Sequence, residues 1–223
     1  MLYDLHTHTT LSDGEYAPVE MVRQAVANGD TAIALTDHAT SADMARIIPE
    51  IIKVCELARN YWNILAIPGV ELTHEPARKI AETAKKAKQM GAWLVVVHGE
   101  TIMEPVEKGT NFAALNSPDV DILAHPGLLT LEEAKLAAER GIFLEISARK
   151  GHSLTNGHVA RLAQIAGAQM LVDSDAHKDT ELLTTAFANQ VVHGAGLDDD
   201  ICKRVLNDNP QSLVSKVMTR YRL

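Results

Sequence analysis

Short apolar runs alternate with amphipathic stretches along most of the chain. The apolar runs have the length of buried strands, whereas the amphipathic stretches repeat apolar residues every three to four positions, as helices do. Seven such runs follow one another, at residues 2–6, 31–36, 63–71, 92–98, 120–125, 142–147 and 168–175. The pattern therefore predicts strands and helices in regular alternation.

Helical patterns fill the intervals between these runs. They cover residues 18–29, 43–60, 76–91, 131–141 and 158–167, and a segment near 111–116 is left without an assigned type. Several of them end at a glycine, the usual residue just past the end of a helix: Gly29, Gly91, Gly141 and Gly167. From about Glu181 to Met218 the chain predicts further helix, with Pro210 at a helix start.

Repeated right-handed crossovers between strands make those strands parallel, and seven in sequence can close into a barrel with helices outside. We therefore expect an α/β fold, a (β/α)7 TIM-like barrel, in a single domain over residues 1–223. A doubly wound open sheet is the competing architecture. The glycine-rich turn of a dinucleotide site is absent after the first strand, where His6, Thr7 and His8 stand instead.

Composition narrows the classes of partner. The formal net charge of −8 disfavours nucleic acid as a partner, because no overall basic field is present. Cys55 and Cys202 are too few for a disulfide framework, and no apolar run approaches the length of a membrane span. With no apolar signal region at the N-terminus, we expect a cytoplasmic protein that acts without a membrane.

Titratable residues end six of the seven apolar runs. The carboxyl ends of parallel strands share one rim of a barrel, where active sites of such barrels lie. A single histidine at such a place is more often a hydrogen-bonded strand end than an ion ligand. Together these residues would crowd one cavity with repelling or poorly solvated groups, so we expect metal ions among them. The residues are His6, His8, Asp37, His38, Glu71, His98, His125, Asp175 and His177.

The first of these ends, "YDLHTHTTLSDG" at residues 3–14, places two histidines one residue apart. In an extended strand, His6 and His8 project to the same face, together with Asp4. Two imidazoles side by side indicate a shared ion. Asp4 and Asp37 are candidates to orient the ligand imidazoles, with ordinary buried hydrogen bonding as an equally good explanation.

The motifs "DLHTHTTLSDG", "ALTDH", "PGVE", "VVVHGE", "DILAHPG", "SDAH" and "NPQSLV", in this order and spacing, resemble the PHP (polymerase and histidinol phosphatase) domain family. Within it, the chain looks like the archaeal-type, histidinol-phosphatase-like proteins. The resemblance implies the PHP fold, a distorted (β/α)7 barrel with up to three divalent ions at its rim. It implies a first ion on His6, His8, Glu71 and Asp175; a second on Glu71, His98 and His125; and a third on Asp13, His38 and His177.

The expected chemistry is phosphoester hydrolysis. Nitrogen and oxygen ligands suit Zn, Mn or Fe ions, which polarise a phosphoryl oxygen and lower the pKa of a bound water. We expect a metal-bound hydroxide as the nucleophile, as in similar PHP enzymes, and assign no protein nucleophile. The expected partner is a small phosphorylated substrate, with L-histidinol phosphate as candidate. Alternatives are a nuclease or nucleotide phosphatase, a metal-dependent amidohydrolase, and a non-catalytic barrel subunit that binds protein or RNA.

The sixth apolar run differs from the others, because its end, in the stretch "EISARKGH", offers no expected ion ligand. It is followed instead by Arg149, Lys150 and His152 on the next loop. We expect these residues to bind the substrate phosphate, Arg149 above all, since arginine forms a bidentate fork to phosphate oxygens. A solvated charge cluster is the alternative, and the oligomeric state is left open.

Overall fold

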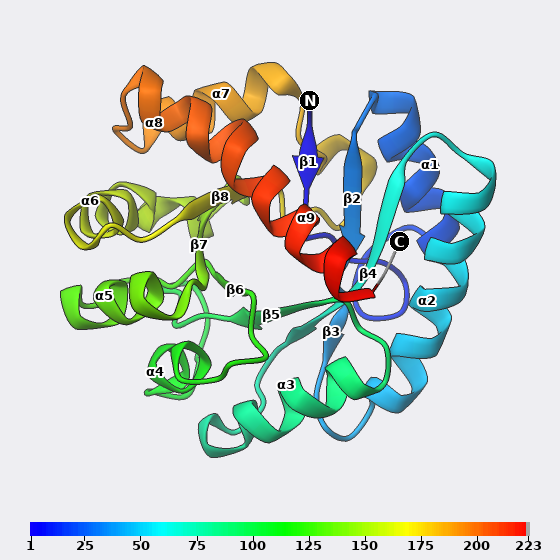
Figure 1. Ribbon diagram of the computed structural model, residues 1–223, viewed down its shortest axis with the longest axis horizontal. Coiled ribbons are helices and arrows are strands. Elements are labelled where there is room, and N and C mark those ends of the chain that lie inside the picture. The colour runs from blue at the N-terminus through cyan, green and yellow to red at the C-terminus, as the bar shows by residue number, and fades with distance from the viewer. Residues whose placement is uncertain (222–223) are drawn as a thin grey trace.

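The computed structural model describes residues 1–221 and contains the seven predicted strands in one parallel sheet that curls into a barrel (Figure 1). The order around the sheet is β1-β2-β4-β5-β6-β7-β8, and a short extra strand, β3, pairs with β4. The fold is therefore a distorted (β/α)7 TIM-like barrel. Its strands are β1 (Tyr3–Asp4), β2 (Ala32–Leu35), β3 (His38–Ala39), β4 (Leu65–Leu72), β5 (Leu94–His98), β6 (Ile122–Ala124), β7 (Phe143–Ser147) and β8 (Met170–Asp173).

The distortion lies at the seam between β1 and β8, where side chains replace part of the strand ladder. The Leu5 N–H donates to Oδ1 of Asp173 at 2.7 Å, and the Ser174 N–H donates to Oδ1 of Asp4 at 3.0 Å. Further along the two strands, an isolated parallel bridge joins their extensions. Carboxylates thus satisfy backbone donors that the two-residue strand β1 leaves unpaired.

Helices form an outer ring around the strands (Figure 1). The ring and its C-terminal extension comprise α1 (Pro18–Asn28), α2 (Met44–Tyr61), α3 (Ile80–Gln89), α4 (Thr110–Leu115), α5 (Leu131–Arg140), α6 (Asn156–Ala166), α7 (Thr185–Gly194), α8 (Asp199–Lys203) and α9 (Asn209–Tyr221). Short 3-10 turns lie at Ala77–Lys79 (η1), His152–Thr155 (η2) and Asp179–Glu181 (η3), and a π-helical turn at Arg204–Asp208 (η4). Within residues 1–221, no helix combines the length and apolar character needed to cross a bilayer.

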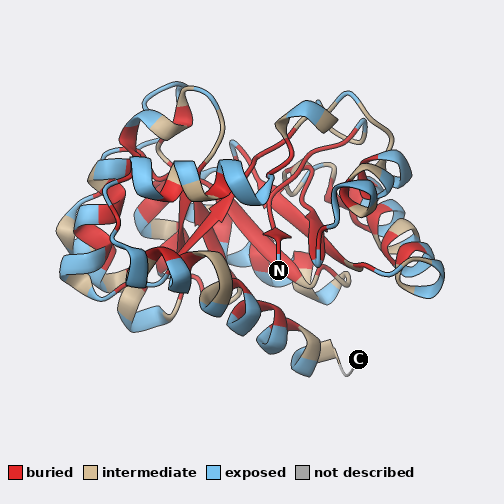
Figure 2. Cartoon of the chain, turned by 90° about the horizontal axis from the view of Figure 1, so that it is seen from above, coloured by how far each residue is buried: buried red, intermediate tan, exposed pale blue. Residues whose placement is uncertain are grey.

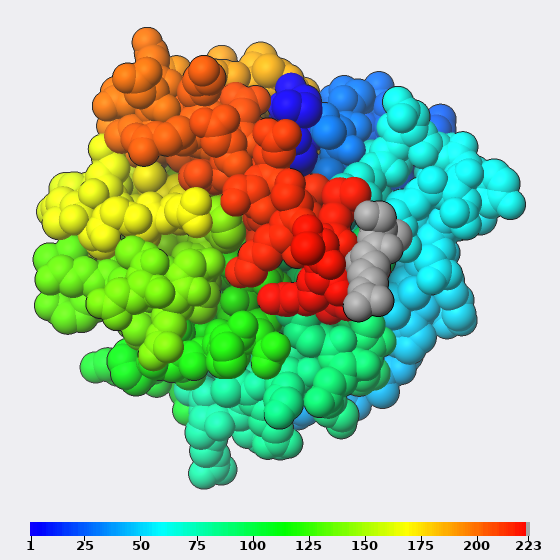
Figure 3. Space-filling view, viewed as in Figure 1, coloured from blue at the N-terminus to red at the C-terminus, as the bar shows by residue number. Residues whose placement is uncertain are grey.

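The last helix, α9, lies across the middle of the ring of strands instead of joining the outer layer (Figures 1 and 3). Its apolar residues Leu213, Val214 and Val217 belong to the same cluster as the side chains inside the barrel, such as Ile67 and Val96. A second apolar cluster fills the space between strands and helices, and Figure 2 shows buried strands inside helices whose outer faces are exposed. The helix therefore closes the amino-terminal end of the barrel.

Shortening a side chain of α9 that packs against the barrel interior is expected to destabilise the fold. Leu213 is 1% exposed, so Leu213→Ala leaves a cavity beneath the barrel interior. We expect the free energy of unfolding to fall by about 2–5 kcal/mol in urea denaturation. The matched control is Met218→Ala on the same helix, where the side chain is only partly buried and a smaller loss is expected. If Leu213→Ala lowers the free energy of unfolding by less than about 1 kcal/mol, α9 does not close the barrel in the way described.

Candidate metal centre

The residues that the sequence resemblance implies as ion ligands gather at the carboxyl ends of the strands, at the end of the barrel opposite α9. Together with His152, they form four groups of nitrogen and oxygen atoms, each compact enough to hold an ion, and some residues belong to more than one group. The groups face a cavity of about 360 Å³ whose lining is dominated by imidazoles and carboxylates. Strand direction explains the convergence, because every strand of the barrel is parallel and ends at this rim.

The first group joins the two histidines after β1 to the aspartate after β8. His8 Nε2 lies 3.1 Å from Asp175 Oδ1 and 3.1 Å from His6 Nε2. All three residues are buried. The expected projection of His6 and His8 to one face is therefore present, and the bridge between the β1 and β8 extensions brings Asp175 beside them.

Glu71 lies at the centre of the site and connects the groups. Its Oε1 is 3.3 Å from His6 Nε2 and 3.5 Å from His125 Nε2, and its Oε2 is 2.6 Å from His38 Nδ1. The side chain is fully buried. A carboxylate with one oxygen toward each side is placed to be shared between neighbouring ions.

A further group lies toward the open edge of the cavity. Asp13 Oδ1 is 3.2 Å from His177 Nε2 and 3.5 Å from His38 Nε2, and His8 belongs to the same group. Asp13 is more than half exposed, unlike the buried donors around Glu71. This group is therefore the one most open to solvent.

Asp37 holds the loop that carries Asp13. Its carboxylate accepts hydrogen bonds from the Thr9 N–H at 2.8 Å and the Ser12 N–H at 3.1 Å. The loop folds back so tightly that a Cβ on Gly14 would lie 2.5 Å from the His8 carbonyl oxygen, so only glycine fits there. Asp37 thus positions a loop, and the expectation that it orients an imidazole is not met.

Glu145, which sequence reasoning missed, takes the role expected of Asp4. Its Oε2 lies 2.6 Å from His6 Nδ1, opposite the ring nitrogen that faces Glu71. Asp4 instead accepts the Ser174 and Leu183 N–H groups at the seam. The signal for Glu145 was its place in "IFLEIS", where a charged residue interrupts a buried strand.

The donors fit divalent ions. Three buried atoms of the candidate ligands have no hydrogen-bond partner: His8 Nδ1, Glu71 Oε1 and His125 Nδ1. The Nε2 atoms of His6 and His8 face each other at 3.1 Å, so one of them must carry a proton or both must face a cation. Nitrogen and oxygen donors without sulfur suit Zn, Mn or Fe.

Without ions, protons supply the positive charge in the site. Burial lowers the pKa of His38, but Glu71 and Asp13 outweigh it and raise that pKa to about 10. Burial likewise opposes protonation of His6, yet Glu145 and Glu71 raise its pKa well above the ordinary value. Burial and His38 lower the pKa of His8 to about 3. The rings of His6 and His38 are thus charged, and the ring of His8 is neutral. A divalent ion bound here would replace the protons.

The three predicted substrate residues go to different places. Arg149 lines the cavity, with Nη1 donating to the Asp175 carbonyl oxygen at 2.9 Å and lying 2.7 Å from His177 Nδ1. Lys150 is exposed and does not line this cavity; it lines a neighbouring one with Phe187, to which Arg149 also contributes, and this differs from the expectation. His152 is buried among the candidate ligands and shares a group with His98 and His125.

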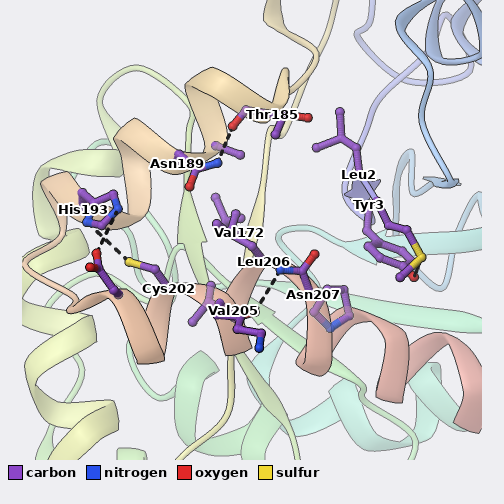
Figure 4. Close-up of a pocket in the computed structure, with 15 residues that line it drawn as sticks. Leu2, Tyr3, Val172, Thr185, Asn189, His193, Cys202, Val205, Leu206 and Asn207 are labelled. Atoms are coloured by element: carbon purple, nitrogen blue, oxygen red, sulfur yellow. Dashed lines mark hydrogen bonds and ion pairs between the residues drawn. The ribbon is translucent and has the colours of Figure 1, made fainter.

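A second cavity, of about 330 Å³, lies beside the β1–β8 seam between the N-terminus and helices α7 and α8 (Figure 4). There His193 Nδ1 is 3.7 Å from Cys202 Sγ, and its Nε2 is 3.8 Å from Asp199 Oδ1. Burial and the neighbouring Asp199 raise the pKa of the thiol, which therefore stays protonated and is a poor nucleophile. The chemistry-bearing site is the rim of the barrel.

Comparison with known proteins agrees with this geometry. The family model described as "PHP domain" matches residues 4–192. The chain belongs to the PHP domain family. This PHP domain is 45% identical over 218 residues to an uncharacterized protein of Methanocaldococcus jannaschii, covering 97% of this chain and 100% of that one. It is 29% identical to a probable phosphatase of Shewanella halifaxensis, covering 98% of this chain and 93% of the relative.

Solved structures show the same fold at low identity. A chain in archaeal ribonuclease P with mature tRNA has a TM-score of 0.73 and 14% identity to the PHP domain, with coverage of 98% of this chain and 93% of the other. The histidinol phosphate phosphatase of Lactococcus lactis, complexed with zinc, L-histidinol and phosphate, has a TM-score of 0.58 and 16% identity, with coverage of 88% and 94%. These likenesses concern the fold alone.

Proposed function

We propose that this PHP domain is a metal-dependent phosphoesterase that hydrolyses a small phosphomonoester, with L-histidinol phosphate as the candidate substrate. The observation that carries the proposal is the central position of Glu71 between groups of buried imidazoles, a donor set that fits clustered divalent ions. The names of similar proteins support the class: several are probable phosphatases, and one neighbour in fold is a histidinol phosphate phosphatase.

Bound ions at such a site polarise a phosphoryl oxygen, activate water and stabilise the leaving oxygen. The chain's own residues would place those ions beside a cavity of about 360 Å³. Its described lining contains no Phe, Tyr or Trp on which a nucleobase would stack. The cavity thus favours a compact, polar leaving group over a nucleotide.

The direct test is phosphate release after chelation and restoration of Mn²⁺, Zn²⁺ or Fe²⁺, with histidinol phosphate, 4-nitrophenyl phosphate and nucleotides as substrates. We expect turnover that requires a metal ion and prefers a small monoester. Metal ions bound without turnover of any of these substrates would contradict the proposal and favour a non-catalytic binding role.

Arg149 is expected to receive the substrate phosphate, since its guanidinium lines the cavity beside His177. Removal of a charge-assisted hydrogen bond costs about 1.5–3 kcal/mol, so Arg149→Ala should raise KM for the best substrate about 10- to 100-fold. Lys150→Ala is the matched control, because that side chain faces another cavity, and its kinetics should not change. Unaltered KM and kcat in Arg149→Ala, with metal content intact, would remove Arg149 from substrate binding.

A further inference from the structure

His152 sits inside the cluster of candidate ion ligands although it follows the one strand whose end offers no expected ligand. It begins the 3-10 turn η2 after β7, and only 5% of its surface is exposed. Its ring stacks on that of His125, with centroids 4.2 Å apart and 18° between the planes. The ring of His98 stands at 89° to it, at 6.1 Å.

The three imidazoles bring their nitrogens close together. Ligand nitrogens of His98, His125 and His152 all lie within 4.8 Å of one another. An ion such as Zn²⁺ binds imidazole nitrogen at about 2.0–2.1 Å, so the three nitrogens must move closer together for all of them to bind one ion. The same region also holds Glu71, whose Oε1 is 3.5 Å from His125 Nε2.

The Nδ1 atom of His152 has a hydrogen-bond partner outside the ligand group, as the second ring nitrogen of a metal-binding histidine usually does. Thr101 Oγ1 lies 2.7 Å from Nδ1 of His152. When this hydroxyl accepts the Nδ1 proton, Nε2 keeps its lone pair for an ion, which is the tautomer that ligand histidines need. That Nε2 faces acidic oxygens, at 3.6 Å from Glu104 Oε1 and 3.9 Å from Asp175 Oδ2.

We propose that His152 is a ligand of the same ion as His98 and His125, and that Thr101 positions its ring. This ligand is additional to the set that the sequence resemblance implies, and it moves His152 from substrate binding to metal binding. The inference rests on the proposed function only in that both require an ion at this rim.

The test measures metal binding without substrate. Wild type, His152→Phe and His152→Ala are stripped of metal and titrated with Zn²⁺ and Co²⁺ in equilibrium dialysis, and the visible spectrum of bound Co²⁺ is recorded. His152→Phe keeps an aromatic ring against His125 but has no donor atom. We expect one ion to bind at least about 100-fold more weakly, more than the 10- to 100-fold typical of losing an outer hydrogen-bond partner, with a changed Co²⁺ spectrum.

Two further variants separate the ligand from its surroundings. His74→Ala is the matched control, because His74 lines the same cavity, with its ring 5.7 Å from that of His98, and belongs to no candidate ligand group. It should leave every metal affinity unchanged. Thr101→Val removes the hydroxyl at Nδ1 and should weaken the same ion as His152→Phe, by about 10- to 100-fold.

Unchanged stoichiometry, affinity and Co²⁺ spectrum in folded His152→Phe would overturn the inference. If a separate kinetic assay showed only a raised KM in that variant, His152 would be a substrate-binding residue and not a metal ligand. Because no substrate enters the titration, the result is independent of the proposed function: a protein that binds the ion through His152 but releases no phosphate keeps this inference and loses the phosphoesterase.

Discussion

Glu71→Gln is expected to lower metal-dependent phosphate release by at least about 10³-fold, since the ions supply several kcal/mol of transition-state stabilisation and each 1.36 kcal/mol is about tenfold in rate. The substitution keeps the size of the side chain but removes the charge that faces His6, His38 and His125. Each ion that Glu71 would share should then bind to the protein more weakly. Metal content and turnover are measured on the same samples.

Glu75→Gln is the matched control for this substitution. Glu75 is also buried, and it accepts hydrogen bonds from the Ser41 N–H and the Thr83 hydroxyl outside the candidate ligand groups. The amide oxygen of glutamine can still accept the Ser41 N–H, and its NH2 group can donate to the Thr83 hydroxyl, so activity should stay within a few-fold of wild type. Full metal content and near-normal turnover in Glu71→Gln would remove Glu71 from the centre of the site.

The order of strands was predictable from sequence because it depends on local alternation. Each strand of a parallel barrel is buried on both faces and so reads as a short apolar run. The seam was not predictable, because it is closed by carboxylates that accept backbone N–H groups from across the chain, as Asp173 does from Leu5, 168 residues away. The positions of Asp4 and Asp37 were predicted wrongly for a similar reason: their partners are backbone N–H groups and, for Asp37, the Thr9 and Ser12 hydroxyls, and no spacing in the sequence reveals these contacts.

The candidate ligands were predictable where they follow apolar runs directly. His152 and Glu104 were harder to place, because each lies several residues beyond its strand and the loop conformation alone brings it to the cavity. The backbone at the site is also unusual: His125 and Asp175 adopt positive φ values of 27° and 53°. Such strain in residues other than glycine is common at functional sites, and no sequence pattern shows it.

The charge balance of the site gives a second large effect, on the stability of the metal-free protein. His38 has its pKa raised to about 10, because Glu71 and Asp13 outweigh the opposing effect of burial. A raised histidine pKa stabilises the folded state fully below the unfolded value, about 6.5, and the stabilisation is lost as pH rises through the folded value. The stability advantage of wild type over His38→Gln should therefore shrink by about 4 kcal/mol between pH 6.5 and 10.

Urea denaturation of the two chelated proteins across this pH range measures the difference. Comparing two proteins that differ only at His38 removes the contributions of titrating groups that do not interact with His38, such as Asp30, whose pKa burial raises to about 7. Metal-loaded protein is the control: an imidazole that binds the ion has already released its proton to solvent, so the decline with pH should disappear. A difference that stays constant with pH in the chelated proteins would mean that His38 carries no proton there, and the ion would then have no proton to replace at this ring.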